Sequence, residues 1–210
     1  MPTLCAVVPV KGLAHSKSRL LPDLGPERAQ SLVLAMLQDA VAALCRVPEL
    51  DRVVVLTPDA AVAAAAREAG GEVLLRPDPG LSAAVDRAAA ELAPGPDDAL
   101  LVVLGDLPAL APGEVRELLA ALPGRGVALA ATRDGGTSAL LRRPALAIAA
   151  GFGPDSARVH RERAAAAQLP LVERALASLA IDVDRIQDLC DLRRSGAAGP
   201  RTRAWLEAQA

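Results

Sequence analysis

Short apolar runs recur along the chain and predict strands that are buried on both faces. The runs are continuous and do not alternate with polar residues, which is typical of a mainly parallel sheet covered by helices on both sides. The expected strands cover Leu4–Val8, Arg52–Leu56, Glu72–Leu75, Ala99–Leu104 and Val127–Ala131.

Helical patterns separate these strands, and several carry start or stop signals. Pro26 can occupy the first position of a helix whose apolar residues recur to Leu44. Asp59 can cap an Ala-rich helix that ends before Gly70 and Gly71. The other expected helices run from a Ser82 cap through Leu92, from Pro112 through Leu122, over Asp155–Gln168 and over Asp184–Arg194.

This alternation of strands and helices predicts one α/β domain over residues 1–210, with a three-layer architecture. The rhythm changes over Thr132–Gly153, which is rich in Gly, Thr, Ser and Arg. We expect loops and short strands there, lying over the edge of the sheet. Ligands of open α/β sheets bind at the carboxyl ends of the strands, so functional residues are expected in the loops that follow them.

Composition narrows the functions that such a fold can carry. The chain has one Phe, one Trp and no Tyr, and its net charge is −2, which disfavours a nucleic-acid surface. No apolar run reaches the ~20 residues that span a bilayer, and no basic signal-peptide segment precedes the first strand. We therefore expect a cytoplasmic protein. Three cysteines have neither metal-binding nor disulfide spacing and are expected to be buried thiols: Cys5, Cys45 and Cys190.

Lysine is almost absent from this chain. Of the 23 basic residues only Lys11 and Lys17 are lysine, and both lie in the loop after the first expected strand, with Arg19 close behind. An ammonium is a compact point charge that a flat guanidinium does not replace everywhere, and anchoring phosphate is a standard use of it. The loop lacks P-loop spacing, because Gly12 and Lys17 are too close together. We interpret it as a phosphate site; a merely basic solvated loop is the alternative.

Three aspartates are candidates for a metal site. Asp106 follows the strand Ala99–Leu104, and a carboxylate at the end of a central strand suits Mg²⁺, which prefers one or two carboxylates plus substrate phosphates. Asp182 and Asp184 are expected on one face of a short strand, where either could complete the site. The alternatives are a turn role for Asp106 and a helix cap for Asp184.

Two Gly-rich turns favour a second anion. The segment Asp134–Ser138 contains two glycines and Thr137, which offer the free amides and hydroxyls of an anion nest. Gly153 and Ser156 lead into an expected helix, whose N-terminus attracts phosphate, and His160 follows about one turn later. Taken singly, each turn is more simply an ordinary turn and cap.

Taken in order, these motifs resemble the family of phosphoenolpyruvate or 2-phospho-L-lactate guanylyltransferases of coenzyme F-420 biosynthesis. That family is similar to molybdenum-cofactor guanylyltransferases and other GT-A-like nucleotidyltransferases. Ser82 and Ser138 stand where the family commonly has Asn, and Arg185-Ile-Gln-Asp188 stands where it has Thr-Pro-Glu-Asp. The resemblance rests on Pro9-Val-Lys with Lys17-Ser-Arg-Leu, Asp78-Pro-Gly-Leu-Ser82, Gly105-Asp-Leu-Pro108, Asp134-Gly-Gly-Thr-Ser138, and Phe152-Gly with Ser156 and His160.

The resemblance implies transfer of GMP from GTP to the phosphate of a three-carbon acid, with release of pyrophosphate. Lys11, Lys17 and Arg19 would neutralise the triphosphate, and Mg²⁺ on Asp106 would bridge nucleotide oxygens. The implied nucleotide site also includes Gly80, Leu81 and Ser82, and the implied acceptor site consists of Thr137, Gly153 and Ser156.

Two other classes stay open. One is a nucleotidyltransferase with a different acceptor, such as 3-phosphoglycerate, a molybdopterin or a sugar phosphate. The other is a nucleotide-binding protein without catalysis. The oligomeric state is also open, with a homodimer as one option.

Overall fold

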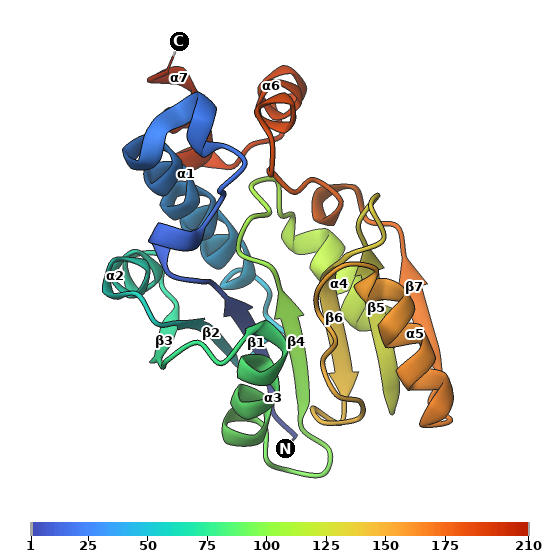
Figure 1. The fold of residues 1–210 in the computed structure, drawn as a ribbon. Coiled ribbons are helices and arrows are strands. Elements are labelled where there is room, and N and C mark those ends of the chain that lie inside the picture. The colour runs from blue at the N-terminus through green and yellow to red at the C-terminus, as the bar shows by residue number, and fades with distance from the viewer. Residues whose placement is uncertain (1, 210) are drawn as a thin grey trace.

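Seven strands form one sheet in the computed structural model, which describes residues 2–209. Their order across the sheet is β3-β2-β1-β4-β6-β5-β7 (Figure 1). The five expected strands are all present, β6 falls in the segment where loops and short strands were expected, and β7 was not predicted. The bounds are β1 Leu4–Pro9, β2 Arg52–Thr57, β3 Glu72–Leu75, β4 Ala99–Val103, β5 Gly126–Ala131, β6 Thr137–Arg143 and β7 Leu171–Arg174.

The strand β6 confirms a strand within Thr132–Gly153, but it lies inside the sheet, so the expected position over the sheet edge is wrong. It pairs antiparallel with β4 and β5, whereas β1 pairs parallel with β2 and β4. Polar residues at buried positions concealed its place inside the sheet. Ser138 Oγ donates to the Ala130 carbonyl at 3.1 Å and Arg142 Nη1 donates to Asp86 at 2.6 Å, while Arg142 Nε and Nη2 have no hydrogen-bond partner among the described residues.

Helices cover both faces of the sheet and begin close to the expected signals. Gly25, with φ of 73°, breaks the first helix, so that its regular part starts at Pro26. Asp59 caps α2 by accepting from the Ala61 amide at 2.9 Å. Ser82 is not a cap, because Gly80 precedes the first residue of α3. The helices are α1 Leu21–Leu44, α2 Ala60–Glu68, α3 Leu81–Leu92, α4 Pro112–Ala121, α5 Ser156–Ala166, α6 Ile186–Ser195 and α7 Pro200–Glu207, with 3₁₀ turns η1 Leu13–His15 and η2 Ala177–Leu179.

The core has two main apolar layers, one on each face of the sheet. Alternate residues of β1 divide between them: Ala6 and Val8 pack with residues of α1, α2 and α4, while Val7 packs with residues of α3 and α5. This confirms the predicted three-layer α/β fold. A third cluster joins α6 and α7 to α1 through residues that include Met36 and Leu192.

The cysteines differ in burial, contrary to the expectation that all three are buried. Cys5 lies in the core within β1, but Cys45 at the end of α1 and Cys190 on α6 are exposed, and all three are free thiols. Burial raises the pKa of the Cys5 thiol to about 11. Over residues 2–209, none of the helices is both long enough and apolar enough to cross a membrane.

Candidate active site

Lys17 points inward from the loop between β1 and α1 and joins three segments of the chain. Its side chain is 7% exposed, and its Nζ donates to Asp106 Oδ2 at 2.5 Å and to Asp184 Oδ1 at 2.8 Å. Its φ of 51° lies in the left-handed region, which is uncommon outside glycine and is found at functional sites where the surroundings impose it. The predicted phosphate loop and two of the predicted carboxylates therefore meet at one ammonium.

The sheet brings the Lys17 loop and the Asp106 turn together. Because β1 and β4 are parallel neighbours, their carboxyl ends reach the same edge of the sheet. Gly105 permits the close approach, since a Cβ there would lie 2.8 Å from Val10 Cγ2. On the other side of β4, the Leu104 amide donates to the Ser138 carbonyl at 3.0 Å, which places the Asp106 turn beside the start of β6.

The cluster is electrostatically coupled. Burial alone lowers the pKa of the Lys17 ammonium, but the charges of Asp106 and Asp184 outweigh it, so the pKa is raised and the ammonium stays charged. Burial, together with the charges of Asp106 and Asp184, raises the pKa of the Asp182 carboxyl. A cation bound here would relieve that repulsion.

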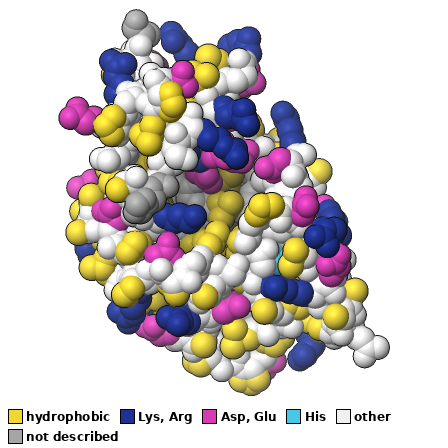
Figure 2. Space-filling model, in the orientation of Figure 1, with side chains coloured by type: hydrophobic (Ala, Val, Ile, Leu, Met, Phe, Trp, Pro, Cys, Tyr) yellow, Lys and Arg dark blue, Asp and Glu magenta, His cyan; other side chains and the backbone are white. Residues whose placement is uncertain are grey.

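A cleft of about 260 Å³ opens beside this cluster. Charged side chains gather around the hollow on the face shown in Figure 2. Lys11 is exposed on the cleft wall, and Arg19 approaches Asp184 Oδ2 at 3.6 Å from outside. The structure therefore brings all three predicted cations to one region. The cleft is lined by Pro9, Val10, Lys11, Ser16, Lys17, Val33, Leu81, Leu104, Gly105, Asp106 and Asp184.

The three aspartates fit a magnesium ion in part. Within residues 2–209, no three His, Cys, Asp or Glu side chains converge as a ready-made ligand set, and Lys17 lies between Asp106 and Asp184. However, Asp106 Oδ1 is buried without a hydrogen-bond partner. Mg²⁺ needs only one or two carboxylates when substrate phosphates supply other ligands. The unpaired oxygen of Asp106, with Asp182 and Asp184 nearby, is compatible with that mode of binding.

The segment that carries Asp182 and Asp184 is a loop, so the expected strand alternation there is wrong. Asp184 also does not cap α6. The N-cap position is Arg185, and the amides of Asp184 and Arg185 donate to Asp188 Oδ2 at 2.9 and 2.7 Å, so the Asp188 side chain reaches back and fixes the backbone before α6. An acidic residue at the third position of a helix is the sequence signal for such a cap. The Asp184 carboxylate is consequently free to pair with Lys17.

The predicted nucleotide residues after β3 are only partly directed at the cleft. Gly80 has φ of 98°, and its amide donates to Asp78 Oδ1 at 2.8 Å, which forms a turn before α3. Leu81 lines the cleft beside Lys11. Ser82 instead accepts a hydrogen bond from the Phe152 amide at 2.9 Å. This contact ties α3 to the loop before α5.

The predicted acceptor residues come together at the start of β6 and α5. Ser156 Oγ lies 3.1 Å from Thr137 Oγ1, and the Gly153 carbonyl accepts from the Ser156 amide at 3.2 Å. The Ala157 amide donates to the Gly135 carbonyl at 3.1 Å, so the two Gly-rich turns lie side by side. Thr137 and Ser156 are buried, at 2% exposure each.

Beneath these hydroxyls lies His160, a residue to which the sequence alone gave no role. Its Nδ1 is 3.1 Å from Thr137 Oγ1, and its Nε2 accepts from the Gly151 amide at 3.0 Å. The ring also packs edge-on against Phe152, with 5.2 Å between ring centroids. Burial and the nearby Arg163 and other charges lower the pKa of His160 to about 4.

A second cleft, of about 400 Å³, extends the site toward the β5–β6 turn. It shares Asp184 with the first cleft and borders the Gly-rich turn of the proposed acceptor site. Its lining residues are Arg19, Arg133, Asp134, Ala180, Ile181, Asp182, Asp184, Arg185, Asp188, Asp191, Leu192 and Ser195.

The fold of this chain is shared by solved structures of nucleotidyltransferases. A putative nucleotide-diphospho-sugar transferase from Desulfovibrio desulfuricans is similar over 100% of this chain and 96% of its own, with a TM-score of 0.77 and 20% identity. A nucleotidyl transferase from Methanothermobacter matches 92% of this chain and 97% of its own, with a TM-score of 0.69 and 21% identity. At these identities the likeness shows the fold.

Sequence comparison identifies the family. The model of the family described as "Guanylyl transferase CofC like" matches residues 4–208, and the chain belongs to this family. A phosphoenolpyruvate guanylyltransferase of Sphaerobacter thermophilus is 39% identical, covering 90% of this chain and 92% of its own length. One of Nocardia farcinica is 44% identical, covering 96% of this chain and 89% of its own length.

Proposed function

We propose that this protein transfers GMP from GTP to the phosphate of phosphoenolpyruvate and releases pyrophosphate, as a step of coenzyme F-420 biosynthesis. The observation that carries the proposal is membership of the guanylyl transferase family over residues 4–208, with relatives of that activity at 39% and 44% identity. The Lys17 cluster at the carboxyl edge of the sheet supplies a matching site. A cytoplasmic location belongs to the same proposal, and the oligomeric state stays open, with a homodimer as one option.

The reaction needs positioning and charge neutralisation, and no covalent enzyme intermediate. A phosphate oxygen of the acceptor attacks the α-phosphorus of GTP in line with the bond to the β-phosphate. That bond breaks, and pyrophosphate leaves with its electron pair. Lys11, Lys17 and Arg19 hold the triphosphate and offset the charge that develops on the leaving group.

The metal would be held by Asp106 together with Asp182 or Asp184. When bound, Mg²⁺ supplies positive charge at nucleotide phosphate oxygens. The nucleotide base and ribose lie beside Gly80 and Leu81, with Ser82 acting through its contact to Phe152. The acceptor lies over the two turns formed by Thr137, Gly153 and Ser156, on the side of the cluster nearest to β6.

Pyrophosphate release tests the proposal. Purified protein is mixed with GTP, Mg²⁺ and one acceptor at a time: phosphoenolpyruvate, 2-phospho-L-lactate or 3-phosphoglycerate. The product is trapped by the enzyme that consumes it, because it is unstable. We expect the highest kcat/KM with phosphoenolpyruvate, and much lower turnover when ATP replaces GTP.

Two outcomes would contradict the proposal. A higher kcat/KM with another phosphorylated acceptor would show that the protein is a nucleotidyltransferase with a different acceptor substrate. GTP binding measured by calorimetry, with no pyrophosphate released for any acceptor, would indicate a nucleotide-binding protein without catalysis.

A further inference from the structure

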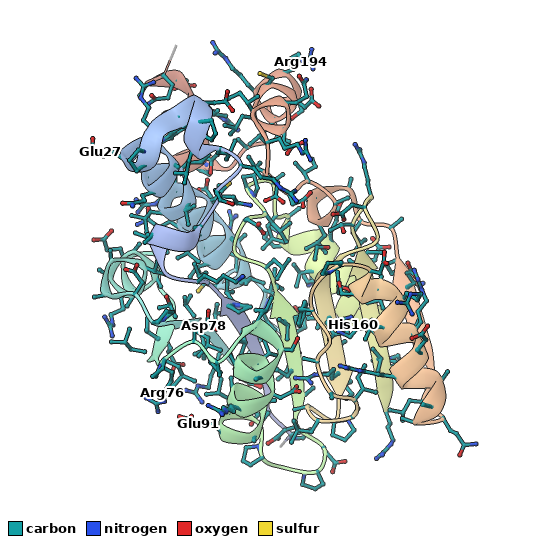
Figure 3. The ribbon with its side chains drawn as sticks, viewed as in Figure 1. Glu27, Arg76, Asp78, Glu91, His160 and Arg194 are labelled. Atoms are coloured by element: carbon teal, nitrogen blue, oxygen red, sulfur yellow. The ribbon has the colours of Figure 1, made fainter. Side chains whose placement is uncertain are left out.

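We infer that His160 is a positioning residue that directs one hydroxyl hydrogen of the Thr137–Ser156 pair at an oxygen of the acceptor's phosphate or carboxylate. The inference rests on the proposed function, because that function places the acceptor at these turns. Figure 3 shows His160 between α5 and the sheet, away from Asp78 and the α3 side of the molecule. It is 0% exposed, so it acts on a ligand only through its neighbours.

The Gly151 amide decides which imidazole nitrogen carries the hydrogen. A backbone N–H can only donate, and this one lies 3.0 Å from His160 Nε2. Nε2 must therefore present its lone pair. A buried ring that stays neutral then carries its hydrogen on Nδ1, and a partner at one nitrogen commonly determines the tautomer in this way.

The Nδ1–H has one partner, Thr137 Oγ1, at 3.1 Å. The imidazole thus donates, and the threonine oxygen accepts. Thr137 Oγ1 also lies 3.1 Å from Ser156 Oγ, so the ring and the two hydroxyls form a short chain. Among residues 2–209, neither hydroxyl makes another side-chain hydrogen bond.

Counting hydrogens along this chain shows what remains for a ligand. His160, Thr137 and Ser156 contribute one hydrogen each, but only two hydrogen bonds link these three side chains to one another. If Ser156 donates to Thr137, the Thr137 hydrogen is left over; if Thr137 donates to Ser156, the Ser156 hydrogen is left over. In both arrangements one O–H is uncommitted, and it suits an anionic oxygen.

The opposite tautomer would remove this donor. With the hydrogen on Nε2, Nδ1 would accept from Thr137, and Thr137 would accept from Ser156. Both hydroxyl hydrogens would be used inside the protein, and the pair would present only lone pairs to an anion. The Gly151 amide therefore determines, through the tautomer of the His160 ring, whether the acceptor site offers a hydroxyl hydrogen to an anion.

Three consecutive amides hold the loop that carries Gly151. Gly151 donates to His160, and Phe152 donates to Ser82 Oγ at 2.9 Å. The Ala150 amide is held by Asp86, with 3.0 Å to Oδ2. The loop is thereby fixed to both α3 and α5, which keeps the Gly151 amide aimed at the ring.

Nitrogen NMR gives a direct test of the tautomer. The chain has two histidines, so a sample labelled with ¹⁵N-histidine contains only two rings to assign, and a His15→Gln variant identifies the signals of His160. We expect a neutral ring protonated at Nδ1 at neutral pH. A ring protonated at Nε2, or a doubly protonated ring, would overturn the inference without any assay of activity.

Two substitutions separate positioning from packing. In His160→Asn the amide nitrogen occupies the place of Nδ1 and can still donate to Thr137. In His160→Gln the end of the side chain reaches the place of Nε2 and keeps a partner for Gly151, but the donor to Thr137 is lost. We expect the KM for phosphoenolpyruvate to rise about tenfold or more in His160→Gln and less than about threefold in His160→Asn, with the KM for GTP unchanged in both.

The outcomes are distinguishable from failure of the proposed function. If the unaltered protein does not transfer GMP to phosphoenolpyruvate, the proposed function is wrong. If it does, and both variants change the two KM values in parallel with their loss of thermal stability, His160 is a packing residue and the inference is wrong. Melting temperatures of both variants are measured beside the kinetics for this comparison.

Discussion

A single ammonium holds the centre of the site together. Lys17 is buried, adopts a left-handed backbone conformation and contacts carboxylates from two distant segments. The guanidinium of an arginine is larger and planar, with five N–H donors in a fixed arrangement. It therefore cannot replace a compact ammonium between two carboxylates. The scarcity of lysine in this chain is consistent with that requirement.

Replacing Lys17 by Arg should remove most of the activity although the charge is kept. We expect kcat/KM for GTP to fall by about tenfold or more, because the planar guanidinium of the introduced arginine displaces Asp106 and Asp184 from their positions. Steady-state kinetics measures the effect, and Arg116→Lys, at an exposed position of α4 outside both clefts, serves as the matched control. Full activity of Lys17→Arg would refute the argument from lysine.

Asp106 is the carboxylate on which metal dependence should rest. In Asp106→Asn the shape is kept, but the charge beside the unpaired Oδ1 is lost. Turnover should fall by orders of magnitude, and the melting temperature should change little because Lys17 keeps its contact with Asp184. Turnover of the unaltered protein that is insensitive to EDTA would show that no metal is involved.

At the scale of elements, the proposed acceptor site is a contact between the start of β6 and the start of α5. Thr137→Val and Ser156→Ala each remove one hydroxyl from the row of hydrogen bonds that begins at His160. We propose that this row ends at the acceptor. Losing a hydrogen bond to a charged group costs ~1.5–3 kcal/mol, so each change should lower kcat/KM for the acceptor by roughly ten- to a hundredfold.

The double variant should cost less than the product of the two single effects, because both hydroxyls serve one outward hydrogen. Titration of GTP binding by calorimetry is the control, since we propose that the β1–α1 loop and Asp106 hold the nucleotide. Weakened GTP binding with an unchanged KM for the acceptor would mean that the two subsites have been interchanged.

The same element contact predicts how stability depends on pH. The pKa of His160 is lowered to about 4 from an ordinary value of 6.5, by burial first and then by Arg163 and Arg142, with Asp86 opposing. Between these values the unfolded chain takes up a proton that the folded chain does not, so the free energy of unfolding falls as the pH falls.

Denaturant titrations at about pH 7 and about pH 4.5 measure this effect. The unaltered protein should lose more stability on acidification than His160→Asn, which has no group that titrates at this position. Equal losses would show that the buried imidazole contributes nothing to the pH dependence.

For the whole molecule, a carboxylate in α1 anchors the C-terminal helix. Asp39 is 8% exposed, and its oxygens accept from the Arg201 and Thr202 amides at 3.0 and 2.8 Å. Gly199 leaves room for it, since a Cβ there would lie 2.5 Å from Asp39 Cγ. The first amides of α7 are therefore capped from a helix that lies far away in the sequence.

Asp39→Ala should lower the free energy of unfolding by about 1–2 kcal/mol, the usual cost of losing a helix cap. Hydrogen exchange of the Arg201 and Thr202 amides should become faster, while exchange in β1 and β4 should scale only with global stability. Asp39→Asn, which keeps one acceptor oxygen, should lose less. Unchanged exchange at the start of α7 would show that packing alone holds the helix.

Local patterns were enough to predict most of the fold and part of the site. Continuous apolar runs placed five of the strands, and the run of cations after the first strand, together with Asp106 after the fourth, predicted the sheet edge at which the structure brings Lys17 and Asp106 together. These predictions succeed because hydrophobic periodicity and the carboxyl-edge rule depend on the order of the chain alone.

What only the tertiary structure decided are the pairings between distant residues. β6 lies inside the sheet with Arg142 and Ser138 buried because Asp86 accepts from Arg142 Nη1 and the Ala130 carbonyl accepts from Ser138. Asp184 precedes the N-cap of α6, which is Arg185, and its carboxylate pairs with Lys17. A buried polar group needs a hydrogen-bond partner, and the partner can come from a segment far away in the sequence. The local pattern of apolar and polar residues does not show which segment supplies it.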